Sequence, residues 1–183
     1  TLAAGDIDGD GLADLVVARP SGTSTRVVLG RSRGDGSFDW SEEQTFALTG
    51  ALQLADVDGD GRIDLTWNRG NATSTLDVAV SRKGYGTGRW RLLGRQTVAM
   101  SMLQFADVDG DGDADLIGRP VGSDLAVAPA TGDGGFGATG PGLVTCTPSS
   151  TGASQLVAGD WNGDGLVDPA CLALPSEGEA QVY

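Results

Sequence analysis

The chain has 183 residues, of which 39% are hydrophobic and 20% are charged, so it can bury a core of ordinary size within one domain. Its formal net charge of −13 at pH 7 argues against nucleic acid and anionic membrane surfaces as partners. No apolar run approaches the roughly 20 residues of a transmembrane helix, so we expect no membrane insertion.

The first element in chain order is an acidic loop, "DIDGDGLADL", which begins at Asp6. The pattern returns at Asp56, Asp107 and Asp160 as "DVDGDGRIDL", "DVDGDGDADL" and "DWNGDGLVDP", at spacings of 50, 51 and 53 residues. The flanks repeat as well, because "LQLAD" ends at Asp56 and "LQFAD" ends at Asp107. A chance motif would not carry its flanks along, so the sequence predicts four copies of one structural unit.

The segments after each loop have the composition of short β-strands. "STRVVLG", "STLDVAVS" and "DLAVAPA" are rich in β-branched and aliphatic residues and are bounded by turn residues. In the second repeat we expect strands at about 52–55, 64–68, 75–81 and 88–98. Four antiparallel strands in a period of about 50 residues are typical of a β-propeller blade. A β-sandwich is the alternative, but it would not explain the regular spacing.

The predicted fold is therefore all-β, a single partial β-propeller domain over residues 1–183. Its four-stranded blades are expected at approximately 1–50, 51–101, 102–152 and 153–183, the last one incomplete. Because the chain starts and stops inside a blade, we expect it to be part of a larger protein.

The acidic loops have the composition of a cation site. Counted from the first aspartate, a carboxylate or an amide stands at positions 1, 3, 5 and 9, and glycine stands at positions 4 and 6. Alternation lets a tight turn direct three side chains to one point, while the carbonyl of position 7 can point inward. Oxygen ligands without sulfur or imidazole select a hard cation, and their number favours Ca²⁺ over Mg²⁺. We therefore predict three to four Ca²⁺ ions. The predicted ligands are Asp6, Asp8, Asp10, Leu12 and Asp14; Asp56, Asp58, Asp60, Arg62 and Asp64; Asp107, Asp109, Asp111, Asp113 and Asp115; and Asp160, Asn162, Asp164, Leu166 and Asp168.

The residues at position 7, namely Leu12, Arg62, Asp113 and Leu166, are expected to offer only their carbonyl oxygens. The side chain of Asp113 is accordingly expected to be solvated. An EF-hand is excluded, since the glutamate it needs at position 12 is missing from all four loops. The alternative is a set of Asp–Gly hairpin turns without metal, which four copies make improbable. The fourth loop is expected to bind most weakly, because an amide replaces a carboxylate at position 3.

On these loops the chain resembles the FG-GAP/VCBS repeat family, which is known from integrin α-subunits and many bacterial secreted proteins. The family pattern continues with a strand ending near Gly-Ala-Pro and a later turn containing Phe and Gly. Here "ARP" from Ala18 and "GRP" from Gly118 stand at the first of these places, and Phe38 and Phe136 at the second. The second repeat departs from both. The resemblance implies blades of a usually seven-bladed propeller, with Ca²⁺ between the first two strands of a blade. The open faces of a four-blade fragment would then be covered by the remaining propeller half, a second copy or a partner chain.

Cys146 and Cys171 are the only cysteines, and neighbouring blades would bring their segments together. We expect a disulfide between them, which would fit a secreted, extracellular protein; two free thiols are the alternative. Extracellular calcium modules bind at about 10⁻⁴ to 10⁻³ M, which agrees with the same location.

No catalysis is expected, since the chain has no histidine and its clustered carboxylates are assigned to metal. A binding function remains, with either a protein partner or, as in a lectin-like module, a glycan. Three arginines that begin equivalent turns, Arg19, Arg69 and Arg119, are candidates for ligand contacts, as are Trp40 and Trp90, which end equivalent Gly-rich turns. Each set has a structural alternative, namely offsetting the acidic charge for the arginines and packing of an outer strand for the tryptophans.

Overall fold

The computed structural model describes residues 1–69, 75–81, 90–120, 123–141, 154–173 and 181–182. Within these ranges the chain forms fifteen strands and no helix. No helix that could cross a bilayer therefore occurs in the described part. Every strand pair is antiparallel. The predicted all-β class is confirmed.

The first two repeats form one antiparallel sheet each. The first sheet has the order β1-β2-β3-β4, and β5 also pairs with β3, so two short strands share its outer edge. The second sheet has the order β6-β7-β8-β9. The strands are β1 (Leu2–Gly5), β2 (Asp14–Ser21), β3 (Ser24–Ser32), β4 (Phe38–Trp40), β5 (Gln44–Phe46), β6 (Ala51–Ala55), β7 (Asp64–Asn68), β8 (Thr75–Ser81) and β9 (Trp90–Thr97).

The third and fourth repeats each contribute three described strands, in the orders β10-β11-β12 and β13-β14-β15. The pairing of β10 shifts between Ser101 and Gln104, where Met102 has a φ of 58°. The strands are β10 (Met100–Ala106), β11 (Asp115–Pro120), β12 (Ala126–Ala128), β13 (Ser154–Gly159), β14 (Asp168–Ala173) and β15 (Gln181–Val182).

The second repeat gives the most direct comparison with the strands expected from the sequence. Those expected at 64–68 and 75–81 are β7 and β8, with the same bounds. Those expected at 52–55 and 88–98 correspond to β6, which starts one residue earlier, and to β9, which ends one residue earlier. Strand composition bounded by turn residues was thus sufficient to locate all four strands.

The hydrophobic core lies between neighbouring sheets. Trp67 of β7 is fully buried against the first sheet, with its ring centroid 4.9 Å from that of Phe46. Val57 and Leu116 are buried between the second and third sheets, and Ile117 and Leu156 between the third and fourth. Residues on both faces of β7 and β11 are therefore buried, and on β7 these include the polar residues Asp64 and Thr66.

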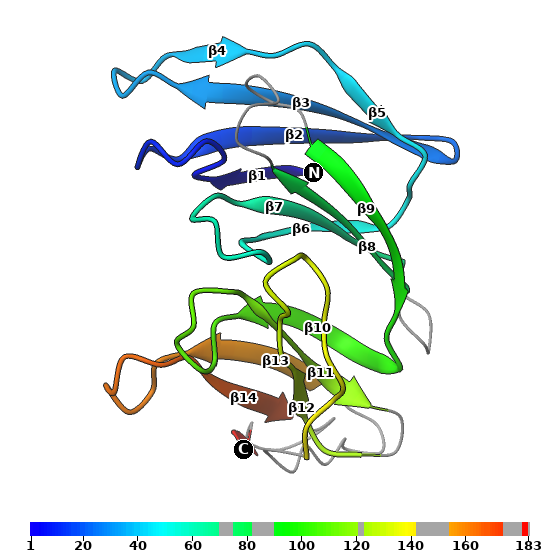
Figure 1. The fold of residues 1–183 in the computed structure, drawn as a ribbon, viewed down its shortest axis with the longest axis vertical. Helices are drawn as coiled ribbons and strands as arrows, with labels where there is room; N and C mark the ends of the chain where they lie inside the picture. The colour runs from blue at the N-terminus through cyan, green and yellow to red at the C-terminus, as the bar shows by residue number, and fades with distance from the viewer. Residues whose placement is uncertain (70–74, 82–89, 121–122, 142–153, 174–180, 183) are drawn as a thin grey trace.

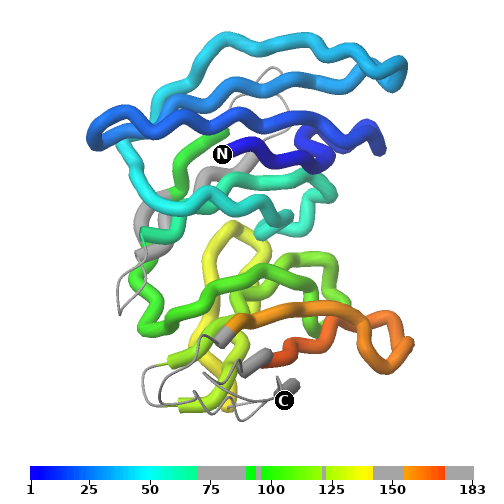
Figure 2. Tube along the Cα trace, turned by 180° about the vertical axis from the view of Figure 1, so that it is seen from behind, coloured from blue at the N-terminus to red at the C-terminus, as the bar shows by residue number. Residues whose placement is uncertain are grey.

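The four acidic loops lie along one side of the molecule. They connect β1 to β2, β6 to β7, β10 to β11 and β13 to β14, on the left in Figure 1 and on the right in Figure 2. The turn between β2 and β3 is at the opposite side. The stacked sheets thus present one row of acidic loops.

Candidate metal centre

The aspartate at position 1 shapes each loop through hydrogen bonds to the main chain. In the first loop, Gly9 N–H donates to Asp6 Oδ1 at 2.8 Å and Gly11 N–H donates to Asp6 Oδ2 at 2.9 Å. The glycines at positions 4 and 6 have positive φ values of 76° and 84°, a conformation that strains residues with a Cβ. The third and fourth loops repeat both bonds, from Gly110 and Gly112 to Asp107 and from Gly163 and Gly165 to Asp160.

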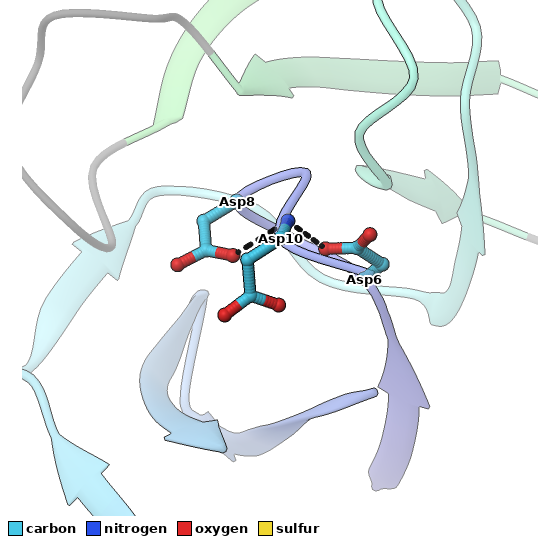
Figure 3. Close-up of side chains that lie close together, drawn as sticks. All are labelled: Asp6, Asp8 and Asp10. Carbon is cyan, nitrogen blue, oxygen red and sulfur yellow. Dashed lines mark hydrogen bonds between the residues drawn. The ribbon is translucent and has the colours of Figure 1, made fainter. Parts of the chain in front are cut away.

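The carboxylates at positions 3 and 5 close the turn further. Asp10 N–H lies between the first two carboxylates, 3.2 Å from Asp6 Oδ1 and 3.3 Å from Asp8 Oδ1 (Figure 3). Leu12 N–H then donates to Asp10 Oδ1 at 2.9 Å. Each aspartate thus bonds to an amide a few residues on, which draws the three carboxylates together.

The aspartate at position 9 has a structural role that the sequence analysis missed. Asp115 is 1% exposed and accepts hydrogen bonds from Val108 N–H at 3.1 Å and from Ala130 N–H at 2.8 Å. Its carboxylate therefore joins the loop to the chain that follows β12. Burial, more than any other effect, raises the pKa of this carboxyl. Asp14 makes the same two connections in the first repeat, to Ile7 and Ser32.

Three of the loops bring carboxylate oxygens within 4.8 Å of one another, which is close enough to share one cation. The fourth loop forms no such group of three among the described residues. The groups are Asp6, Asp8 and Asp10; Asp56, Asp58 and Asp64; and Asp107, Asp109 and Asp115. Of the other predicted side-chain ligands, Asp14 is fully buried and accepts two main-chain hydrogen bonds, and Asp60 pairs with Arg62.

The second loop contains carboxylate oxygens that the protein itself does not satisfy. Asp56 Oδ1 and Asp58 Oδ1 are buried and receive no hydrogen bond from the described residues. Burial, followed by repulsion from neighbouring carboxylates, raises the pKa of Asp58. A buried carboxylate oxygen without a donor is costly, so these two oxygens fit a cation better than an empty turn.

Neighbouring loops are joined to one another through position 8. Ile63 N–H donates to the main-chain oxygen of Asp6 at 2.8 Å, and Ala114 N–H donates to that of Asp56 at 2.6 Å. The second and third loops therefore each donate an amide to the first aspartate of the loop before it.

The side chain at position 7 also touches the preceding loop. The stem of Arg62 lies over Gly9, and Leu166 lies over Gly110. Asp113, expected to be solvated, is instead half-buried against Gly59, because the two loops pack together there.

Two arginines lie within the row of carboxylates. Arg31 of β3 reaches Asp8, with 2.6 Å between Nε and Oδ2. Arg62 pairs with Asp60 of its own loop through Nε, at 3.1 Å and 3.0 Å from the two carboxylate oxygens, and through Nη2. Loops of similar sequence thus differ in how much of their charge the protein already offsets.

The candidate ligand-binding tryptophans are in different environments. Trp40 on β4 is 57% exposed, with its ring over Gly30, as a stacking residue would require. Trp90 is 5% exposed and belongs to the core between the first two sheets, while its main chain bonds to the side chain of Gln44. Trp90 is thus buried by the packing of its outer strand, the structural alternative named for it, and this burial does not favour contact with a ligand.

The three candidate arginines lie near the ends of β2, β7 and β11, away from the acidic loops. Arg19 is exposed, whereas Arg69 and Arg119 are half-buried. Arg119 Nε donates to Ser123 O at 3.1 Å, so it stabilises its own turn. The residues 70–74 and 121–122 of the neighbouring turns lie outside the described part.

The predicted pairing of Cys146 with Cys171 stays a prediction. Cys171 is buried in β14, in the core between the third and fourth sheets. Cys146 lies outside the described residues.

Comparison with known proteins identifies the repeated unit. The FG-GAP-like repeat matches residues 6–67, 56–118 and 107–169, and each match runs from one acidic loop into the next repeat. No curated protein matches the chain. Among solved structures, a chain in the Photorhabdus luminescens Tc holotoxin pore is similar, at 19% identity and a TM-score of 0.47. The similarity covers 94% of this chain and 8% of that one.

Proposed function

Because this chain belongs to the FG-GAP-like repeat family, we propose that it is a calcium-stabilised β-propeller scaffold whose sheets are blades and whose acidic loops hold Ca²⁺. The blades would be four of a larger, usually seven-bladed ring. The observation that carries the proposal is the convergence of three aspartates within 4.8 Å in each of three repeats. The unsatisfied oxygens of Asp56 and Asp58 add to it.

The donor set fits a hard divalent ion, because it offers carboxylate oxygens and no sulfur or imidazole. Bound Ca²⁺ would supply two positive charges to each loop. The protein's own residues orient the ligands. The amides of positions 4 and 6 fix the carboxylate at position 1, and the buried carboxylate at position 9 ties the loop to the rest of its sheet. Calcium binding would therefore stabilise the sheets as well as the loops.

Thermal unfolding in calcium and in chelator tests this proposal. Calcium at about 100 times its dissociation constant contributes roughly 2.7 kcal/mol per site. For a chain of 183 residues this corresponds to a rise in Tm of about 7 °C per site. The D58A variant should lose one such increment. The D35A variant removes an exposed aspartate outside the acidic loops, so it should keep the full rise in Tm that calcium causes. An equal Tm in calcium and in chelator would refute the metal assignment.

We further propose that the scaffold is extracellular, has no catalytic activity and binds a protein partner on the side opposite the acidic loops. Three features support this proposal: the absence of histidine, the proposed use of the clustered carboxylates as ligands, and the variable sequences that follow Arg19, Arg69 and Arg119. Extracellular calcium concentrations would also keep such loops occupied.

A glycan ligand is the second candidate, and the exposed ring of Trp40 favours it. It has less support than the sequence suggested, because Trp90 is buried. A glycan array and an affinity pull-down with the calcium-loaded chain separate the two candidates. Saturable sugar binding lost in W40A would favour the glycan. One captured protein, released by the combined R19A, R69A and R119A variant with calcium-dependent melting intact, would favour the protein partner.

A further inference from the structure

The second acidic loop differs from the others in having a positively charged side chain at position 7. Position 7 is Leu12 in the first loop, Asp113 in the third and Leu166 in the fourth, but Arg62 in the second. The guanidinium of Arg62 contacts both oxygens of Asp60, the aspartate at position 5. Position 5 is one of the oxygen donors expected for a cation.

Packing against the first acidic loop holds this arginine in place. Its side chain is 13% exposed, compared with 57% for Arg33, which pairs with an aspartate on the surface. The stem of Arg62 lies over Gly9, where an added Cβ would be 3.2 Å from Cγ. A guanidinium whose stem is held between two neighbouring loops loses little additional conformational freedom when it pairs, which favours the ion pair.

Two carboxylate oxygens of the loop still lack a hydrogen-bond donor in the described part of the chain. Arg62 satisfies Asp60, whereas Asp56 Oδ1 and Asp58 Oδ1 are buried without a donor among the described residues. The loop is thus partly neutralised from within. A metal ion entering it meets one carboxylate that is already paired and a positive charge beside the site.

We propose that Arg62 acts as an internal counter-ion that lowers the calcium affinity of the second loop by competing for Asp60. The inference rests on the proposed calcium scaffold and concerns one of its sites. Ion pairs contribute up to about 1 kcal/mol at exposed sites, and this one is mostly covered, so removing the competition should tighten calcium binding at this loop by about fivefold. The second loop should accordingly fill at higher free calcium than the third, whose position 7 adds a negative charge.

Calcium titration followed by amide NMR resolves the loops within one molecule. The amide of Gly61 reports the second loop and that of Gly112 the third, because each donates to the first aspartate of its own loop. In the R62L variant the Gly61 midpoint should fall about fivefold, while the Gly112 midpoint stays unchanged. Leucine is tolerated at this position in the first and fourth loops. The R62Q variant, which keeps the stem against Gly9, should give the same shift.

Arg91 provides the matched control. It is exposed on β9 and lines the same hollow of about 430 Å³ as Asp58, so R91L removes an equal charge near the loop. A smaller shift in R91L than in R62L supports competition for Asp60. An unchanged or higher Gly61 midpoint in both R62L and R62Q overturns the inference, as does an equal shift in R91L. Titrations in which neither glycine responds to calcium, up to about 10 mM, would refute the calcium scaffold itself.

Discussion

The aspartate at position 9 should stabilise the fold even without calcium, which separates it from the other predicted ligands. The D115A variant leaves two amides, those of Val108 and Ala130, without their acceptor in the interior. A buried donor left unsatisfied costs about 1 to 3 kcal/mol. The raised pKa of Asp115 indicates that burying its charge is itself unfavourable. Removing the carboxylate therefore offsets part of the cost of the two unsatisfied amides. We expect a net loss of about 3 kcal/mol in the free energy of unfolding.

The comparison variant is D111A, at position 5 of the same loop. Asp111 is exposed and accepts one hydrogen bond, from Asp113 N–H at 2.9 Å. In chelator its replacement should cost less than about 1 kcal/mol. The D115N variant keeps one acceptor oxygen and removes the charge, so its loss of stability should lie between those of D111A and D115A.

Calorimetric melting in chelator measures these differences. For 183 residues, a loss of about 3 kcal/mol lowers the Tm by about 8 °C. In saturating calcium, D111A and D115A should both lose the third calcium site. The difference in Tm between D111A and wild type should therefore be larger in calcium than in chelator. Equal melting of wild type and D115A in chelator would refute a structural role for position 9. An equal loss in D111A and D115A would show that loop charge, rather than the two buried amides, determines stability.

The contact between neighbouring loops predicts that G59A lowers the free energy of unfolding in urea more than G61A does. Both glycines have a positive φ, but only a Cβ on Gly59 would overlap Asp113. Adding D113A to G59A should therefore restore part of the lost stability. Equal losses in the two glycine variants would argue against this contact. In chelator, burial and neighbouring carboxylates raise the folded-state pKa of Asp58, so its ionised form opposes folding above that pKa. The stability of wild type relative to D58N should therefore increase as the pH is lowered towards about 3.9, the ordinary pKa of an aspartate, and denaturation curves showing the reverse trend would contradict it. Non-reducing peptide mapping should find Cys146 joined to Cys171, and two free thiols would remove this support for an extracellular location.

Local features of the structure followed closely from the sequence. The strands β7 and β8 have the bounds that their composition predicted, and the glycines at positions 4 and 6 adopt the positive φ that the turn requires. Both depend on interactions within one repeat, which a repeating sequence displays directly. The convergence of three carboxylates in each of the first three loops follows from the same local pattern.

Features that depend on neighbouring repeats were not predictable in this way. Trp40 and Trp90 occupy equivalent places in the sequence, yet one is exposed and the other buried, because only Trp90 lies between two sheets. Asp113 is a charged loop residue of the kind that is usually solvated, but the preceding loop partly covers it. The double hydrogen bond of Asp115 joins residues 15 positions apart, so no local pattern indicates it. Contacts across sheets require the three-dimensional arrangement.

The joint between successive acidic loops is made of main-chain atoms. An amide at position 8, in Ile63 and again in Ala114, bonds to the carbonyl of the preceding loop's first aspartate. Any residue other than proline can form such a bond, so the side chain at position 8 is free to change. A duplicated or deleted repeat would meet its new neighbour with the same atoms in place. This makes the repeats interchangeable modules, and arrays of different length can arise from one unit without new complementary side chains at this joint.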